Sequence, residues 1–215
     1  MRWPSIAVLL ALPHLTGCIT VAGKNLQDLT PSAASPAPAV EQTVGDFSFH
    51  LDGGKMVTSN KMGREVNDEI LGRWQDSDFI TGHTYVKSSQ FTEASQFRIT
   101  LSGHMEGDSS IILQIISGLT LTVIPYYVDS KMDLRYSVEN AVTGCVFQAE
   151  ASDSYKTVVG LLLLPATPFT QGGSNRTLER LANHLYDQLA SRGAFDPSTH
   201  CAKTDDPVPS TGNPP

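Results

Sequence analysis

Apolar and polar residues alternate along several stretches of the chain, and this period of two predicts β-strands. Strands are expected over residues 47–51, 84–87 and 97–102. The alternation is clearest over residues 132–149, where the sequence Asn-Ala-Val-Thr-Gly at 140–144 interrupts it with residues typical of turns. These residues therefore predict a β-hairpin.

Two other stretches follow the helical period of about 3.6 residues. In the first, Met62, Val66, Ile70 and Trp74 recur every fourth residue. In the second, leucines recur between residues 178 and 189, with Ser174 or Asn175 available as the N-cap and Gly193 as the residue that ends the helix. The two stretches predict two amphipathic helices.

Together these elements predict one α/β (α+β) domain over residues 44–201. We expect a single mixed sheet of about four to six strands with two helices packed on it. The expected order is strand, helix, two strands, an apolar segment, the hairpin, a second apolar segment and the last helix. Residues 18–43, rich in Pro, Ala and Ser, predict an extended, mobile tether, and residues 202–215 predict a disordered tail.

The two apolar segments, residues 111–124 and 158–169, follow neither period. They flank the hairpin, so its pairing brings them together at its open end. One interpretation is that both are central strands buried on both faces, although Pro165 and Pro168 argue against long central strands. The other is an exposed apolar surface that contacts the membrane or a partner. We expect Leu119 inside the fold, and the contact candidates are Leu119, Leu121, Ile124, Leu162, Leu164 and Phe169.

Charge and composition exclude some functions. The chain has 15 Lys and Arg against 22 Asp and Glu, for a formal net charge of −7, and its basic residues are not clustered. Nucleic-acid binding requires clustered basic residues that neutralise phosphates, so no nucleic-acid partner is expected. The chain's three cysteines are too few for a disulfide-rich scaffold and lack the spacing of a zinc site.

The amino terminus has the pattern of a secretory signal. Arg2 precedes a short apolar run at residues 6–12, which is too short to span a bilayer. The following Leu15-Thr16-Gly17-Cys18 resembles the lipobox of bacterial prolipoproteins. That resemblance implies a signal peptide at residues 1–17 and a diacylglyceryl group on Cys18. Since residue 19 is Ile and not Asp, it also implies sorting to the outer membrane, facing the periplasm.

The domain itself is similar to small α/β periplasmic domains of curli-secretion lipoproteins, of lipoprotein activators of cell-wall synthases and of the amino-terminal part of the Tol propeller protein. The similarity rests on the strand that ends at Gly103, on the hairpin turn at Thr143-Gly144 and on a carboxy-terminal helix. It also extends to uncharacterised bacterial lipoproteins. It implies a fold and a compartment, and it brings no catalytic motif.

If Cys18 carries lipid, Cys145 and Cys201 remain. In an oxidising periplasm these two form a candidate disulfide. The alternative is that both are free, one in a strand and the other in the tail.

Motifs that would carry chemistry are largely missing. The sequence contains neither Gly-x-Ser-x-Gly nor His-Glu-x-x-His, and its histidines lack metal-ligand spacing. The densest polar group is His104, Glu106 and Asp108, which is either a polar turn or an acid/base or cation site. We expect no catalytic residue, no metal and no cofactor.

These observations predict a membrane-anchored, non-enzymatic envelope lipoprotein that scaffolds or assists an assembly, secretion or transport complex. The alternatives are a carrier of an apolar small ligand or lipid, with the apolar segments lining a pocket, and an enzyme that uses the region of His104. The expected partners are the membrane, through Cys18, and an envelope protein. A second copy of the chain is a further candidate.

Overall fold

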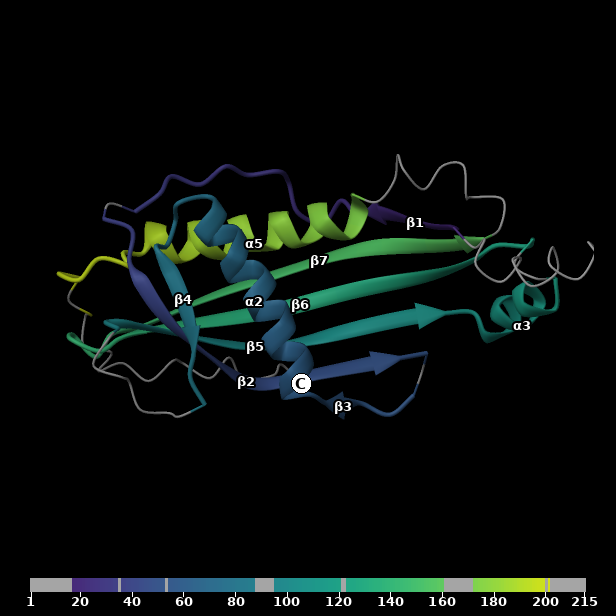
Figure 1. The fold of residues 1–215 in the computed structure, drawn as a ribbon, viewed down its shortest axis with the longest axis horizontal. Coiled ribbons are helices and arrows are strands. Elements are labelled where there is room, and N and C mark those ends of the chain that lie inside the picture. Colours follow the sequence, from purple (N-terminus) through teal and green to yellow (C-terminus); the bar gives the residue numbers. More distant parts are fainter. Residues whose placement is uncertain are drawn as a thin grey trace, which may run out of the picture.

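The computed structural model describes residues 17–34, 36–52, 54–87, 95–120, 123–160, 172–199 and 201 (Figure 1). The predicted contact candidates Leu121, Leu162, Leu164 and Phe169 and the predicted tail at 202–215 lie outside these residues. In chain order the elements are β1 (Gly17–Ala22), β2 (Ala39–Leu51), β3 (Val57–Thr58), α2 (Asn60–Asp76), β4 (Gly82–Tyr85), β5 (Phe97–Ser109), α3 (Ile111–Leu119), β6 (Tyr126–Asn140), β7 (Val146–Gly160) and α5 (Gly173–Ser191).

The strands form one mixed sheet, which confirms the predicted fold class. Its order is β1-β7-β6-β5-β2-β3, and β4 also pairs with β2, which makes seven strands. β2 runs parallel to β4 and β5, and the other neighbouring strands are antiparallel. The sheet exceeds the expected four to six strands because β1 and the two-residue β3 were not predicted. The described residues also contain a third helix, α3.

The core lies between the sheet and the two long helices, α2 and α5. Alternate residues of β6 point into it, as the period of two predicted, and the indole of Trp74 in α2 is fully buried. The indole N–H donates to the carbonyl oxygen of Ala182 in α5 at 2.8 Å. The ring also packs against Tyr186 and Phe195. Trp74 therefore joins both helices over the sheet.

The predictions for the hairpin and for the ends of α5 are correct in part. β6 and β7 pair from Glu139 and Val146 outward, which confirms the hairpin. Gly193 ends α5 with a φ of +74°, as predicted. The predicted caps of α5 are wrong, because the helix begins one residue before Ser174. A side chain at Gly173 would lie 2.3 Å from the backbone of Thr20, so this glycine is needed where α5 meets β1.

The predicted mobile tether at residues 18–43 is contradicted by the structure. Its first part is β1, which pairs with β7. The chain then runs along α5, where the Asn183 amide donates to the carbonyl of Leu29 at 2.8 Å. The Tyr186 hydroxyl accepts from the backbone N–H of Ala34, also at 2.8 Å. Backbone groups thus hold a segment that has few apolar side chains, and composition does not reveal such contacts.

A chain of buried hydrogen bonds joins α2 to the sheet. The Tyr136 hydroxyl donates to Asn67 Oδ1 at 2.6 Å, and Asn67 Nδ2 donates to Gln42 Oε1 at 2.6 Å. Gln42 Nε2 in turn lies 2.9 Å from Nδ1 of His83. Burial, with a smaller contribution from the nearby charge of Asp68, raises the pKa of Tyr136 well above its usual value, so the hydroxyl stays protonated and remains a donor.

Replacing Tyr136 with phenylalanine should destabilise the protein by about 1–3 kcal/mol, because it leaves Asn67 Oδ1 buried without its donor. Urea denaturation measures the change. Tyr127→Phe is the matched control, because Tyr127 is 41% exposed, and its change should stay within about 0.5 kcal/mol. If both variants lose the same free energy of unfolding, the buried hydrogen bond from Tyr136 to Asn67 does not stabilise the protein.

Candidate functional site: the apolar helix α3 and Cys18

Residues 111–119 form a helix, so the interpretation of this run as a buried strand is wrong. Ser110 precedes the helix, and its hydroxyl accepts from the backbone N–H of Leu113 at 3.4 Å. This N-cap starts a helix directly after β5. α3 connects β5 to β6 at one end of the sheet (Figure 1).

The apolar side chains of α3 point away from the fold. Leu119, expected inside the fold, is 81% exposed, and Ile112 is 70% exposed. The exposed large apolar residues of α3 form one stripe, at Ile111, Ile112, Ile115, Ile116 and Leu119. The buried position is polar, since Ser117 is fully buried. An ordinary surface helix has the opposite arrangement. We call these five residues the α3 apolar face.

Polar contacts hold α3 against the sheet. The side-chain amide of Gln114 donates to Asp52 Oδ2 at 3.1 Å and also contacts the hydroxyl of Ser109. The Ser109 hydroxyl donates to the other oxygen of Asp52. The hydrogen bonds from Ser109 and Gln114 lower the pKa of the Asp52 carboxyl, so it is ionised and accepts both at neutral pH. These contacts fix which face of the helix turns outward.

Cys18 is exposed and lies at the same end of the sheet as α3. In β1 it stands opposite Val159 of β7, which stands opposite Tyr126, the first residue of β6. Figure 1 shows β1 beside β7 at the end of the sheet where α3 lies between the end of β5 and the start of β6. Ile124, another predicted contact residue, is also here and is 43% exposed. The structure thus brings together Cys18 and the predicted contact residues that it describes.

A buried ion pair fixes the chain just after β1. Arg180 of α5 lies 2.6 Å from Asp153 of β7, and both side chains are almost fully buried. The same guanidinium donates to the carbonyl oxygen of Gly23 at 2.9 Å. A side chain at Gly23 would lie 2.4 Å from Ser154 Oγ, so the chain passes very close to β7. Gly23 lies only five positions after Cys18, so Cys18 has little freedom to move away from the domain.

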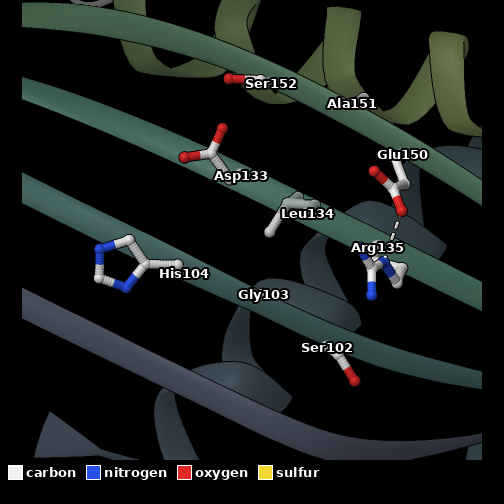
Figure 2. A pocket seen from close by; sticks show the side chains of 9 residues that line it. All are labelled: Ser102, Gly103, His104, Asp133, Leu134, Arg135, Glu150, Ala151 and Ser152. Atoms are coloured by element: carbon white, nitrogen blue, oxygen red, sulfur yellow. Dashed lines mark hydrogen bonds and ion pairs between the residues drawn. The ribbon is translucent and has the colours of Figure 1, made fainter. Parts of the chain in front are cut away.

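The face of the sheet away from the helices is polar. A hollow of about 400 Å³ lies over it, lined among others by His104, Asp133, Arg135, Glu150 and Ser152 (Figure 2). His104 in β5 stands opposite Asp133 in β6, which stands opposite Ser152 in β7. The row contains the residue types of a hydrolase triad. It is the place where the alternative of an enzyme that uses the region of His104 would have its active site.

The hydrogen bonds of this row do not form a catalytic relay. His104 Nδ1 is 3.0 Å from the hydroxyl of Ser48, so the nitrogen that would be oriented by a carboxylate already has a partner. Partial burial raises the pKa of Asp133, but hydrogen bonds from Ser152 and Lys131 outweigh it and lower the pKa overall. Asp133 therefore stays ionised and its bonds go to these neighbours. Glu106 stands opposite Lys131 in the register, as part of the same polar strand surface.

The carrier alternative requires an apolar cavity beneath the residues around α3. A second hollow, of about 620 Å³, lies elsewhere, and charged and polar side chains such as Asp28, Arg176 and Glu179 line it. The apolar side chains of α3 face outward. The geometry therefore favours a contact surface at α3 over a pocket.

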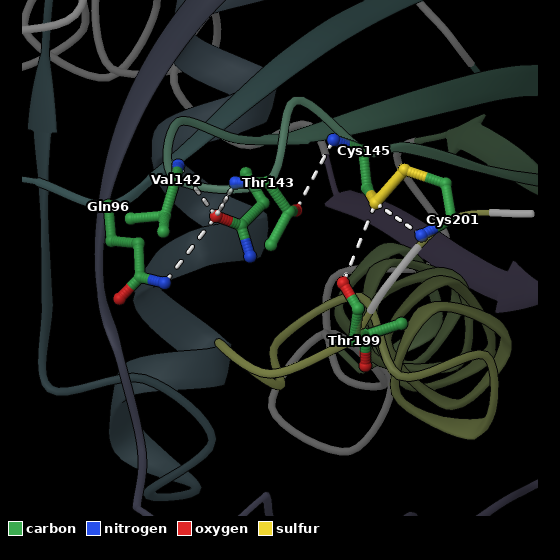
Figure 3. The surroundings of a disulfide bond; sticks show 7 residues. Gln96, Val142, Thr143, Cys145, Thr199 and Cys201 are labelled. Carbon is green, nitrogen blue, oxygen red and sulfur yellow. Dashed lines mark hydrogen bonds between the residues drawn. A yellow bond between two sulfur atoms is a disulfide. The ribbon is translucent and has the colours of Figure 1, made fainter. Parts of the chain in front are cut away.

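Cys145 and Cys201 form a disulfide, with their Cα atoms 5.5 Å apart (Figure 3). Cys145 follows the hairpin turn and is buried, and its backbone N–H donates to the hydroxyl of Thr143 at 3.3 Å. Cys201 lies beyond α5 and is exposed. The bond ties the chain after the last helix to the hairpin, at the end of the sheet opposite α3.

Within the described residues, no three His, Cys, Asp or Glu side chains gather as they would around a metal ion. Within the same residues, no helix has both the length and the apolar character that crossing a membrane requires.

The chain is similar to several solved structures. One is the PelC dodecamer from Paraburkholderia phytofirmans, at 7% identity over 81% of this chain and 96% of that chain, with a TM-score of 0.38. Another is protein XCC0632 from Xanthomonas campestris, which carries the family label DUF330, at 6% identity over 78% and 92%, with a TM-score of 0.35. At these values the similarities carry no argument about function. No protein-family model matches the chain, and no curated protein does.

Proposed function

We propose that this protein is an envelope lipoprotein, held in the outer membrane by acyl chains on Cys18 and facing the periplasm. The observation that carries the proposal is the exposed Cys18 in the first described strand, the last residue of a lipobox-like motif that follows a signal-like apolar run. Each buried methylene contributes about 0.8 kcal/mol to membrane binding, so two or more chains give stable attachment.

Its proposed role is non-enzymatic. The domain would scaffold or assist an envelope complex for assembly, secretion or transport. The polar face of the sheet supports this role, because α2 and α5 pack on the opposite face and it carries charged side chains of both signs, such as Arg135 and Glu150. A partner protein or a second copy of the chain could bind there through complementary charges.

Replacing Cys18 with serine should release the protein from the membrane fraction, because it removes the atom to which lipid is attached. The folded domain should be unchanged, since Cys18 is exposed and makes no disulfide. Membrane fractionation of intact cells, together with incorporation of a labelled palmitate, measures the effect. The label should be present in the wild type and missing from the variant.

Thr20→Ser, at a nearby position of the same strand, controls for general effects of substitution in β1. It should keep both the label and the membrane association. The proposal is wrong if the Cys18→Ser protein still fractionates with the outer membrane to the wild-type extent, or if the wild type incorporates no label.

A further inference from the structure

We propose that α3 lies in the surface of the lipid bilayer beside Cys18 and forms a second membrane contact of this protein. The inference rests on the proposed acylation of Cys18. It adds that the domain does not hang from its lipid on a long tether. Instead, one end of the sheet is held directly on the membrane.

The first support is the reversed amphipathic character of α3. Its apolar face points outward, and its inner side holds the buried Ser117 and the hydrogen-bonded Gln114. The helix contains no Asp, Glu, Lys or Arg. Exposing five large aliphatic side chains in one stripe to water is unfavourable, and lipid removes that cost. At 1.5 Å per residue the helix is only about 14 Å long, so it would lie in the interface and not cross the membrane.

The second support is that Cys18, the proposed lipid site, is held firmly at the same end of the sheet as α3. β1 is hydrogen-bonded to β7 and packs closely on Gly173 through Thr20, and Arg180 holds the chain after it. An acyl chain on Cys18 would therefore bring the adjoining end of the sheet to the bilayer. Once the lipid is inserted, contact between α3 and the bilayer is effectively intramolecular. Even a short helix can then stay bound to the membrane surface.

The third support is the chemistry next to α3. Tyr127, near the start of β6, is 41% exposed, and the Lys156 ammonium lies 4.5 Å from the centre of its ring. Tyrosine and lysine are residues that settle at the level of lipid headgroups. The negative charge of Asp129 is paired with the same lysine at 3.2 Å. The ion pair neutralises the charge of Asp129, while the ionised carboxylate of Asp52 lies on the inner side of α3, where it accepts from Gln114.

The test uses full-length lipoprotein purified from membranes and reconstituted in phosphatidylethanolamine–phosphatidylglycerol vesicles with brominated acyl chains, which quench tryptophan on contact. A tryptophan is placed at Ile112 or, in a second variant, at Leu119. Val142→Trp is the control, since Val142 lies in the hairpin turn at the other end of the sheet and is 74% exposed, comparable to Ile112. The native Trp74 is fully buried, and Trp3 precedes Cys18 and would be removed with the signal peptide.

We expect bromine to lower the emission of the added tryptophan in Ile112→Trp and Leu119→Trp about twofold and to leave that of Val142→Trp almost unchanged. Mass spectrometry of the same samples reports acylation. An acylated protein whose α3 tryptophans are not quenched overturns the inference and leaves the lipid anchor intact. That result would follow if a second copy or another part of the chain covered the helix. A protein without acyl groups overturns the proposed anchor itself.

Discussion

Replacing Arg180 with methionine is expected to destabilise the protein by about 3–5 kcal/mol, because the buried carboxyl of Asp153 would be left without its partner. Asp153 is fully buried on the helix-covered side of β7, so water cannot replace the guanidinium. The same change removes the bond to the Gly23 carbonyl, which should loosen the chain after β1. Guanidinium denaturation of the wild type and the variant measures the loss.

The ion pair between Arg135 and Glu150 is the matched control. It also joins an arginine to a carboxylate in this sheet, at 2.6 Å, but both side chains are about 60% exposed. Arg135→Met should therefore cost less than about 1 kcal/mol. The double variant Arg180→Met/Asp153→Leu should recover most of the stability, because no charge remains buried. If Arg180→Met costs no more than Arg135→Met, the buried pair does not hold the fold.

The parts of the fold that could be predicted are those in which local pattern and tertiary environment agree. β6 alternates because one side faces the helices and the other faces solvent, so its buried residues follow directly from the sequence. The same holds for α2 and α5, each of which buries one apolar stripe. Gly193 ends α5 because a left-handed residue is needed there, a requirement that is local.

The parts that were missed depend on contacts between distant backbone groups. β1 and the segment after it are held by the pairing with β7 and by bonds from Arg180 and Asn183 to carbonyl oxygens. No pattern within residues 18–43 signals such bonds. The buried chain from Tyr136 to Gln42 is equally non-local, since Tyr136 alone reads as one more inward residue of a strand.

The candidate site was only half predictable. Its location followed from the hairpin, which brings the chain on either side of it to one end. Its structure did not, because a short apolar run fits a buried strand as well as a helix. The deciding residues are polar: Ser110 caps the helix, and Gln114 turns its inner side toward Asp52. The apolar run consists mainly of isoleucine and leucine, so the hydrogen bonds of these two polar residues determine which way the apolar face points.

Removing the disulfide, by Cys145→Ala/Cys201→Ser, is expected to destabilise the protein by about 4 kcal/mol, because the bond closes a long loop in the unfolded chain. The 56 residues that it spans include β7 and α5. The bond also holds the chain around Phe195, whose ring packs in the core against Trp74. Denaturation of the wild type with and without a reductant should show the same loss as the double variant, while Cys18→Ser should show none.

The count of titratable thiols tests the pairing itself. A lipidated Cys18 has its sulfur in a thioether, so the mature protein, denatured without reductant, should show no thiol, and reduction should release two from the disulfide. The Cys18→Ser protein should behave identically, which separates the disulfide from the lipid. Two free thiols before reduction would contradict the bond between Cys145 and Cys201. One free thiol that disappears in Cys18→Ser would leave the bond intact and show instead that Cys18 carries no lipid.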